Sequence, residues 1–412
     1  MKIVLIVIDG LGDKPIKALG NKTPLEAAKT PNLDWLAKNG ICGLVQPFKF
    51  AFENTPTSEG THIALFGYEN YFLGRGPYEA AGIGMKMKKG DVALRANFAT
   101  VTPERPSTQR VECSAYGASK KFIVQDRRAG AISRTEPLIK VLTGITIDGV
   151  KFLLQKSYGH RAGLILRGEG LSEKIGDGDP GKEGKKVKTI LPLEKSKKAE
   201  FTARVLNKFL EKAHLVLEKL PENKKRKLPA NYLLLRGAGK FRKAPDFFEK
   251  YHLKSCAVTG PGIYKGIARV LGMNVIEVEG ITGFADTNLR TQFKAVRNLL
   301  ERYDFIFCHI KAADTFSHKG DFLGKKKFIE KIDQNLKILI DVKNAFLVVT
   351  GDHSTPCELR DHSANPLPIL IYGKGLKNGE VLKFSEKACE KGTLKKINQN
   401  DLMKKILSFS SG

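Results

Sequence analysis

The sequence predicts an α/β fold in which a core built around a parallel sheet is interrupted by an inserted second domain. Four apolar runs bounded by glycine or polar residues are typical of strands buried on both faces, as in parallel sheets. Acidic and histidine residues flank these runs only before residue 85 and after residue 300, and the intervening sequence has a different character. The runs cover residues 3–8, 305–313, 346–351 and 367–372.

The first part of the core is predicted to span residues 1–85, beginning with the strand at 3–8. A helix is expected after Thr30 as N-cap, with Pro31 in its first turn and Gly40 as its end. A long active-site loop follows, and it contains the segment TPTSEGTHIALFGYE. This part should therefore run strand, loop, helix, loop.

The inserted α+β domain is predicted to span residues 86–250. Alternating strand patterns begin at Ala93, and a second apparent strand follows Lys151. A Gly-, Asp- and Lys-rich loop at 176–188 precedes a long lysine-rich helix at about 200–220. We expect this domain to choose the substrate.

The second part of the core is predicted to span residues 251–412, where the alternation of strands and helices resumes. Strands are expected near 255 and 274, with helices at 263–271 and 291–303. The strands that carry the candidate metal ligands follow, so the two ends of the chain should build one sheet.

The composition indicates a cytoplasmic protein with no membrane partner. No run approaches the ~20 apolar residues of a membrane span, and Asp9 interrupts an N-terminal apolar run that lacks a cleavage-like site. The six cysteines lie far apart without a CxxC pair, which argues against a disulfide framework or a structural zinc site. No feature of the sequence indicates an oligomeric state.

The formal net charge of +27 raises the possibility of a nucleic-acid-binding protein. The lysines are scattered, however, and the single tryptophan with few interleaved aromatics provides no stacking platform for bases. A solvated lysine-rich surface, as also seen in hyperthermophile proteins, is the favoured interpretation. We expect no nucleic-acid partner but an attraction for small anionic substrates.

The residues that flank the apolar runs form a candidate two-metal site, because ligands of open α/β sheets bind outside the carboxyl ends of the strands. Asp314 and His318 can face one ion from a single helical turn. Asp352 and His353 are adjacent, so in extended backbone they would point opposite ways and serve two ions. Such oxygen and nitrogen donors suit Zn²⁺ or Mn²⁺ better than Ca²⁺. The remaining members are Asp9 and His362.

Simpler interpretations exist for single members of this set. An aspartate that follows a strand, such as Asp9, is more often a helix cap or turn residue when taken alone. A histidine inside an apolar run, such as His309, is typical of a buried core side chain. The recurrence of acidic or histidine residues beside all four apolar runs, at compatible positions, favours the metal site.

Ser58 is a candidate nucleophile, since a small hydroxyl residue in a Gly/Thr-rich loop near two metals can be activated by coordination without a separate base. The alternative is that the Thr-x-Ser-Glu segment only caps the helix that carries His62. The chemistry of the residues leaves both interpretations open.

Eight segments, in order along nearly the whole chain, closely resemble the archaeal-type cofactor-independent phosphoglycerate mutases of the alkaline phosphatase superfamily. The pattern Ser58, Glu59 and His62 is also similar to that of the related bacterial mutases. The resemblance implies an alkaline phosphatase-like core with an inserted cap, and an isomerase that interconverts 2- and 3-phosphoglycerate in glycolysis and gluconeogenesis. The segments are VIDGLGDKPI, TSEGTHIALFGY, GRGPYEAAGIG, RANFATV, QDRRAG, GHRAGLILRG, NYLLLRGAG and TGDHSTPCE.

The resemblance also implies two divalent ions, Mn²⁺ or Zn²⁺ with Mg²⁺ and Co²⁺ as further candidates, and no 2,3-bisphosphoglycerate. Ser58 would be the residue that becomes phosphorylated. The implied ligands are Asp314, His318 and His362 for one ion, and Asp9, Ser58, Asp352 and His353 for the other.

A second implied set binds the substrate, and Arg128 and Lys265 within it would act in catalysis with Ser58. Arginine suits this task because its guanidinium binds carboxylate and phosphate through two hydrogen bonds, although any single arginine can equally form a surface ion pair. The set comprises Asp126, Arg127, Arg128, His160, Arg161, Arg236 and Lys265.

The chain departs from the family pattern at three places, all in the inserted domain. Ala131 stands where a basic residue is usual, and Gly181 replaces a histidine after Asp179 and Pro180. The stretch 104–121 is longer than typical. These departures bear on the choice of substrate, whereas the implied metal ligands and the nucleophile are intact.

The expected mechanism transfers the phosphoryl group to Ser58 and back to the other hydroxyl of the glycerate while the cap excludes water. Two other enzymes would suit the same scaffold: a metal-dependent phosphomonoesterase, and a phosphotransferase similar to the mutase-like homoserine kinases. The nucleotide-binding loop of a Walker type, which would favour the transferase, is not found in the sequence.

Overall fold

The computed structural model describes residues 2–104, 122–260, 262–342, 344–376 and 381–409. The chain forms two compact units. Unit 1 comprises Met1–Phe72 and Ala244–Gly412, and unit 2 is the insertion Leu73–Lys243. The predicted long stretch at 104–121 lies, apart from residue 104, outside the described residues. Among the described residues, no helix combines the length and apolar character that crossing a bilayer requires.

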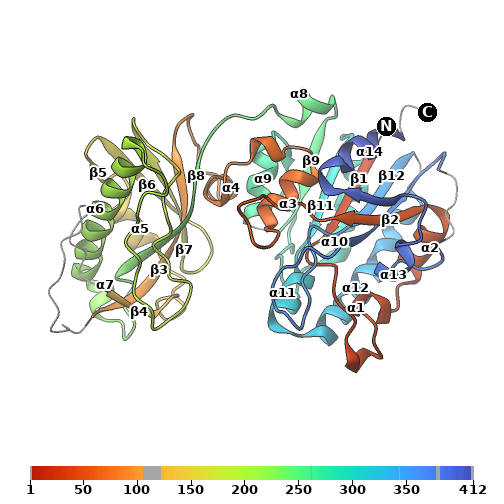
Figure 1. Ribbon diagram of the computed structural model, residues 1–412, viewed down its shortest axis with the longest axis horizontal. Helices are drawn as coiled ribbons and strands as arrows, with labels where there is room; N and C mark the ends of the chain where they lie inside the picture. Colours follow the sequence, from red (N-terminus) through yellow and green to blue (C-terminus); the bar gives the residue numbers. More distant parts are fainter. Residues whose placement is uncertain (1, 105–121, 261, 343, 377–380, 410–412) are drawn as a thin grey trace. The chain divides into compact units, whose positions relative to one another are not determined.

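Unit 1 is an α/β unit around an eight-stranded sheet in the order β10-β9-β11-β1-β12-β13-β2-β14 (Figure 1). β1 lies at the centre and pairs in parallel with both β11 and β12. The strands are β1 Lys2–Ile8, β2 Ile41–Gln46, β9 Ser255–Val258, β10 Asn274–Val275, β11 Phe305–Ile310, β12 Ala345–Thr350, β13 Leu367–Tyr372 and β14 Lys395–Asn398.

One strand differs from the parallel-sheet prediction, since β13 runs antiparallel to both β12 and β2. The connection at 351–366 contains no helix. A parallel crossover usually contains a helix, whereas this helix-free connection returns the chain in the opposite direction. As a result, the segment before β13, which holds His362, starts at the edge where β12 ends.

Helices cover both faces of this sheet (Figure 1). On one face, alternate β1 side chains from Val4 to Ile8 belong to the same core as residues of α2, α10 and α12. On the other face, Phe66, just after α3, packs edge-on against Phe307 of β11. The helices include α1 Pro24–Ala27, α2 Pro31–Asn39, α3 Ser58–Leu65, α8 Phe247–Tyr251, α9 Ile263–Val270, α10 Leu289–Leu299, α11 Ala312–Lys319, α12 Phe322–Ile340, α13 Glu386–Cys389 and α14 Leu402–Ser408.

Unit 2 has an antiparallel sheet in the order β4-β3-β7-β6-β5, with β8 pairing on β3. The apolar residues of the amphipathic α6 belong to the core beneath one face, and Phe209 stacks on Phe152 of β6. The strands are β3 Val92–Pro103, β4 Phe122–Asp126, β5 Thr146–Ile147, β6 Val150–Lys156, β7 Arg161–Arg167 and β8 Tyr232–Lys240; the helices are α4 Arg75–Gly82, α5 Glu136–Leu142, α6 Lys197–Lys219 and α7 Pro221–Lys224.

Candidate active site

Three buried carboxylates meet at one edge of the unit 1 sheet. Asp9 directly follows β1, Asp314 lies in the first turn of α11 after β11, and Asp352 follows β12. Because β1 pairs in parallel with β11 and β12, the carboxyl ends of all three strands lie side by side. The three residues are 0 %, 3 % and 0 % exposed, so their charges must be compensated locally.

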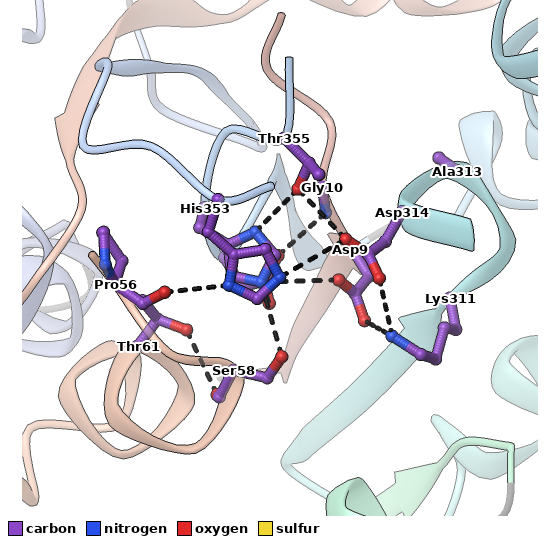
Figure 2. Close-up of polar contacts among 12 residues, drawn as sticks. Asp9, Gly10, Pro56, Ser58, Thr61, Lys311, Ala313, Asp314, His353 and Thr355 are labelled. Atoms are coloured by element: carbon purple, nitrogen blue, oxygen red, sulfur yellow. Dashed lines mark hydrogen bonds and ion pairs between the residues drawn. The ribbon is translucent and has the colours of Figure 1, made fainter. Parts of the chain in front are cut away.

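A glycine lets the loops at this edge approach one another. Gly10 has a φ of +66°, which favours glycine, and a Cβ at this position would lie 2.8 Å from both the Asp314 Cα and the Thr355 Oγ1. Figure 2 shows Gly10 beside Thr355 and Asp9. The Gly10 N–H donates to Asp352 Oδ1 at 3.0 Å. The close approach of the β1, β11 and β12 loops therefore requires glycine here.

Three histidines present their Nε2 atoms to these carboxylates. The Nδ1–H of His318 donates to the Arg360 carbonyl at 2.8 Å, and that of His362 donates to the Pro56 carbonyl at 2.9 Å. Because a carbonyl can only accept, Nδ1 carries a proton in both rings, and the two Nε2 atoms, 3.2 Å apart, can serve as ligands of one ion.

His353 is oriented in the same way through Thr355. The Thr355 hydroxyl donates to Asp314 Oδ1 at 3.0 Å, so it must accept from His353 Nδ1, also at 3.0 Å. His353 Nε2 then lies 3.1 Å from Asp352 Oδ2. Such outer hydrogen bonds are typical of metal-ligating histidines, whose orientation they fix.

Two groups of donor atoms are close enough to hold an ion each, since the atoms within a group lie within 4.8 Å of one another. One group is Asp314, His353 and His362, and the other is Asp9, Asp352 and His353. His353 belongs to both. His318 lies beside the first group, with Nε2 3.3 Å from Asp314 Oδ1.

The expected divergence of Asp352 and His353 is wrong. It assumed an extended backbone, but the chain bends at both residues just after β12. The two side chains consequently point into the same cluster, as their contact of 3.1 Å shows. Asp314 and His318, by contrast, lie one turn apart on α11 as their spacing predicted.

The cluster fits divalent cations because several of its buried polar atoms have no hydrogen-bond partner among the described residues. Burial and the neighbouring Asp9 raise the pKa of Asp352 well above its ordinary value. Burial also opposes the ionisation of Asp9, but Lys311 and His309 outweigh it and hold the pKa of Asp9 well below its ordinary value. The unpartnered atoms are Asp9 Oδ1, Asp352 Oδ2, His62 Nε2 and both ring nitrogens of His309.

Ser58 is the first residue of α3 and lies beside this cluster. It is 8 % exposed, and its Oγ is 3.4 Å from His353 Nε2. The hydroxyl that caps α3 belongs to Thr57, which accepts from the Gly60 N–H at 3.2 Å. The capping role that the sequence left open for the segment therefore falls to Thr57, and the Ser58 hydroxyl is available for chemistry.

Lys311 and Tyr264 are polar residues of this cluster that were not predicted from the sequence. The Lys311 ammonium lies 3.0 Å from Asp9 Oδ2 and 3.0 Å from Asp314 Oδ2, and Figure 2 shows it between these two carboxylates. Tyr264 donates a short hydrogen bond to Asp9 and is 3.1 Å from Lys311 Nζ. Lys311 precedes Asp314 by one helical turn, and this spacing was the one signal in the sequence.

His309 is buried, as the simpler interpretation of the sequence had it, yet it is more than a packing residue. Its Nε2 lies 3.4 Å from Asp9 Oδ2, and its ring stacks on Tyr264 with centroids 3.6 Å apart. Lys265, which follows Tyr264 in α9, instead pairs closely with Glu277. No contact between Lys265 and the three carboxylates is found in the part of the chain that the structure describes.

Unit 2 carries a separate group of arginines. Arg95 on β3 is opposite Arg236 on β8, and Arg161 on β7 is opposite Asn97 on β3. The Arg236 Nε is buried without a hydrogen-bond partner among the described residues. Burial, together with nearby arginines led by Arg161, lowers the pKa of His160 to about 4. An excess of positive charge of this kind attracts anions.

Carboxylates hold two sides of this arginine group. Arg127 pairs with the buried Asp179 at 2.5 Å, while Glu79 accepts from Arg95 at 3.4 Å. Neither Glu79 nor Arg95 was predicted from the sequence, although both lie in segments that carried the family resemblance. Asp126 acts differently, since its carboxylate accepts the backbone N–H of Arg128 at 2.6 Å and so shapes the turn.

The two single-residue departures from the family pattern both lie in turns with positive φ. Ala131 has a φ of 56°, and Gly181 has a φ of 82°, a conformation that suits glycine. The Gly181 N–H donates to Asp179 Oδ1 at 2.9 Å, so this turn supports the partner of Arg127.

Comparisons with known proteins agree over the whole chain. A family described as the metalloenzyme superfamily matches residues 1–408. A protein from Methanocaldococcus jannaschii named 2,3-bisphosphoglycerate-independent phosphoglycerate mutase 1 is 43 % identical over 420 residues, covering 99 % of this chain and 97 % of its own. A protein of the same name from Archaeoglobus fulgidus is 45 % identical over 411 residues, covering 98 % and 96 %.

Two solved structures are similar over their full length. One, from Pyrococcus horikoshii, has a TM-score of 0.81 and 32 % identity, covering 100 % of this chain and 97 % of its own. The other is titled cofactor-independent phosphoglycerate mutase from Thermoplasma acidophilum, with a TM-score of 0.69, 34 % identity and complete coverage of both chains.

Proposed function

Because the chain belongs to the metalloenzyme superfamily, and within it to the 2,3-bisphosphoglycerate-independent phosphoglycerate mutases, we propose that it interconverts 2- and 3-phosphoglycerate. The observation that supports this most is the convergence of three histidine Nε2 atoms and three buried carboxylates beside the hydroxyl of Ser58. The family is metal-dependent, and the donor set of imidazole nitrogen and carboxylate oxygen favours Mn²⁺ or Zn²⁺.

We assign the role of metal ligand to the seven residues that the family resemblance implied. Asp314, His318 and His362 would hold one ion, and Asp9, Ser58 and Asp352 the other, with His353 Nε2 close enough to serve either. When bound, divalent ions would withdraw charge from the phosphoryl oxygens and lower the pKa of the Ser58 hydroxyl.

Ser58 is the acceptor in the proposed reaction. Its Oγ loses its proton and attacks phosphorus as the bond to the glycerate oxygen breaks, giving phosphoserine, and the freed glycerate oxygen takes up a proton. The other glycerate hydroxyl then loses its proton and attacks phosphorus, the bond from phosphorus to Ser58 Oγ breaks, and Oγ takes up a proton. Lys311 supplies positive charge beside Asp9 and Asp314, where negative charge would otherwise accumulate.

The arginine group of unit 2 is the proposed binding site for the anionic groups of the substrate. Arg127 is pre-oriented by Asp179, and the unpartnered Arg236 Nε offers a donor to a carboxylate or phosphate oxygen. We assign Arg128, His160 and Arg161 to the same role. Burial and the nearby arginines, which together lower the pKa of His160, support this assignment.

Trapping the phosphoserine tests the proposal. Mn²⁺-loaded protein is mixed with 3-phosphoglycerate, quenched in acid and digested, and the phosphorylated peptide is identified by mass spectrometry. The proposal expects phosphate on Ser58, in the peptide that also holds Thr57. Phosphate on another residue, or on none in a protein that turns over, would contradict it.

A metal-dependent phosphomonoesterase is the alternative reaction on the same scaffold, and it would share the phosphoserine but release free phosphate. A homoserine kinase-like transferase would require a nucleotide as phosphoryl donor. We further propose a cytoplasmic location, because the cysteines of the described residues are all free and buried, as fits a reducing compartment.

A further inference from the structure

A buried ion pair contacts the loops that carry the proposed metal ligands and takes no part in the proposed reaction. Lys325 of α12 is 0 % exposed, and its Nζ lies 2.8 Å from Asp13 Oδ2, whose side chain is 1 % exposed. Removing two charges from water is costly, and apolar residues of similar volume often replace such a pair without loss of stability. The pair is therefore better explained by what it holds in place.

The pair joins the two loops that carry metal ligands. Lys325 Nζ donates to the Gly12 carbonyl at 3.1 Å and to the Thr355 carbonyl at 3.2 Å. Asp13 Oδ1 accepts the Cys357 N–H at 3.1 Å. All three N–H donors of the ammonium are thus used. Two of their acceptors lie in the β1 loop and one lies in the β12 loop, so Lys325 links the two loops.

The two loops are closely packed against each other. The Thr355 N–H donates to the Gly12 carbonyl at 3.0 Å, and a Cβ on Gly12 would lie 2.0 Å from the Ser354 Oγ. Hydrogen bonds from Lys325 to the Thr355 carbonyl and from the Thr355 N–H to Gly12 therefore fix the backbone of Thr355. Its side chain in turn holds Asp314 and His353 at 3.0 Å each.

We propose that Asp13 and Lys325 are positioning residues for the metal centre, acting through Thr355 on Asp314 and His353. The Lys325 ammonium contacts the Thr355 backbone, and the Thr355 hydroxyl contacts Asp314 and His353. Asp314 belongs to one of the two donor groups, and His353 belongs to both. This inference rests on the proposed two-ion site but not on the mutase reaction, so it is tested by metal binding.

The test is the Mn²⁺ affinity of full-length Lys325→Met, measured by titration calorimetry on metal-free protein. Loss of outer-shell support typically weakens metal binding 10- to 100-fold, and we expect a loss in that range. Thr355→Val, which removes the hydroxyl, should show a similar loss. Because Lys325 acts through Thr355, the variant that combines Lys325→Met and Thr355→Val should bind Mn²⁺ no more weakly than the single variant with the lower affinity.

A second ion pair serves as the matched control. Arg167 lies 2.7 Å from Asp91, which is 3 % exposed, in unit 2. Arg167→Met should lower the melting temperature without changing the Mn²⁺ affinity. If Lys325→Met folds poorly, the apolar double variant Asp13→Leu with Lys325→Met restores charge balance in the core and should still bind Mn²⁺ weakly.

The outcomes separate the two proposals. Wild-type affinity in a folded Lys325→Met or in the apolar double variant would overturn the positioning role, as would additive losses from Lys325→Met and Thr355→Val. If the wild-type protein itself binds no divalent cation, the proposed two-ion site fails, and the positioning role falls with it.

Discussion

The hydroxyl oxygen of Ser58 lies 3.4 Å from Nε2 of His353, and both residues are buried at the carboxyl edge of the unit 1 sheet. This contact unites the first turn of α3 with the loop after β12, segments 295 residues apart in the chain. The proposed nucleophile and a proposed metal ligand are thereby brought together by the fold, not by local sequence.

Ser58→Ala should reduce mutase turnover to below about one per cent of wild type, because the variant has no acceptor for the phosphoryl group. Thr57→Ala is the control, since it removes the α3 cap at a cost of about 1 kcal/mol in stability but keeps the acceptor. Turnover is measured from 3-phosphoglycerate with saturating Mn²⁺. Activity that survives in Ser58→Ala would assign the nucleophile to another hydroxyl, with Thr55 or Thr57 as candidates.

Lys311→Met should lower kcat about 100-fold at saturating Mn²⁺, the usual effect of removing one preorganised electrostatic contact. Lys265→Met should have a smaller effect, because the Lys265 ammonium is already paired with Glu277. Steady-state kinetics of both variants check this ranking. A larger loss in Lys265→Met would restore the catalytic role that the family resemblance implied for Lys265.

Arg128→Ala should shift the products of 3-phosphoglycerate from 2-phosphoglycerate towards free phosphate. Losing one charge-assisted hydrogen bond costs about 1.5–3 kcal/mol, so the glycerate should escape roughly 10- to 100-fold more often before it is rephosphorylated. Arg204→Ala, on the exposed side of α6 where the guanidinium lies over Phe201, is the control. Equal partitioning in wild type and Arg128→Ala would make Arg128 a structural residue.

The stability of unit 1 should fall with rising pH because of Glu386. Burial raises the pKa of Glu386 to about 7 from the ordinary 4.5, so the folded protein keeps a proton that the unfolded chain releases. Its stabilising effect is therefore complete below the unfolded pKa and is lost as the pH rises through the folded one. The loss should amount to about 3 kcal/mol.

Glu386→Gln isolates this titration, since the amide stays neutral at every pH. The variant loses an acceptor for either the Thr23 hydroxyl or the Asp13 N–H, but that offset does not depend on pH. The free energy of unfolding is measured with urea for both proteins at about pH 5 and about pH 8. The value for wild type relative to that for Glu386→Gln should be lower at the higher pH. A constant difference between the two proteins would contradict the raised pKa.

Much of the site followed from the sequence because strand ends obey a simple rule. Asp9, Asp314 and Asp352 each follow a buried strand, and parallel pairing places such ends at one edge. The spacing of Asp314 and His318 likewise fixed them on one helical turn. These predictions depended on local patterns that the fold preserves.

The rest depended on contacts that no local pattern carries. A strand buried on both faces shows no periodicity that reveals its direction, so the reversal of β13 was missed. Lys311 and Tyr264 become neighbours of Asp9 only in the folded chain, where β11 pairs with β1 and Tyr264 of α9 bonds to Asp9. Asp13 and Lys325 are 312 residues apart in the chain and show no shared motif.

The central claim is tested most directly by incubating the Mn²⁺-loaded protein with 3-phosphoglycerate as the sole phosphorylated compound, and following both products by ³¹P NMR. The mutase account predicts that 2-phosphoglycerate appears until the two isomers reach equilibrium, without added 2,3-bisphosphoglycerate and with little free phosphate. Metal removal by a chelator should stop the reaction. Release of free phosphate without 2-phosphoglycerate, or no turnover with any divalent cation, would contradict the account.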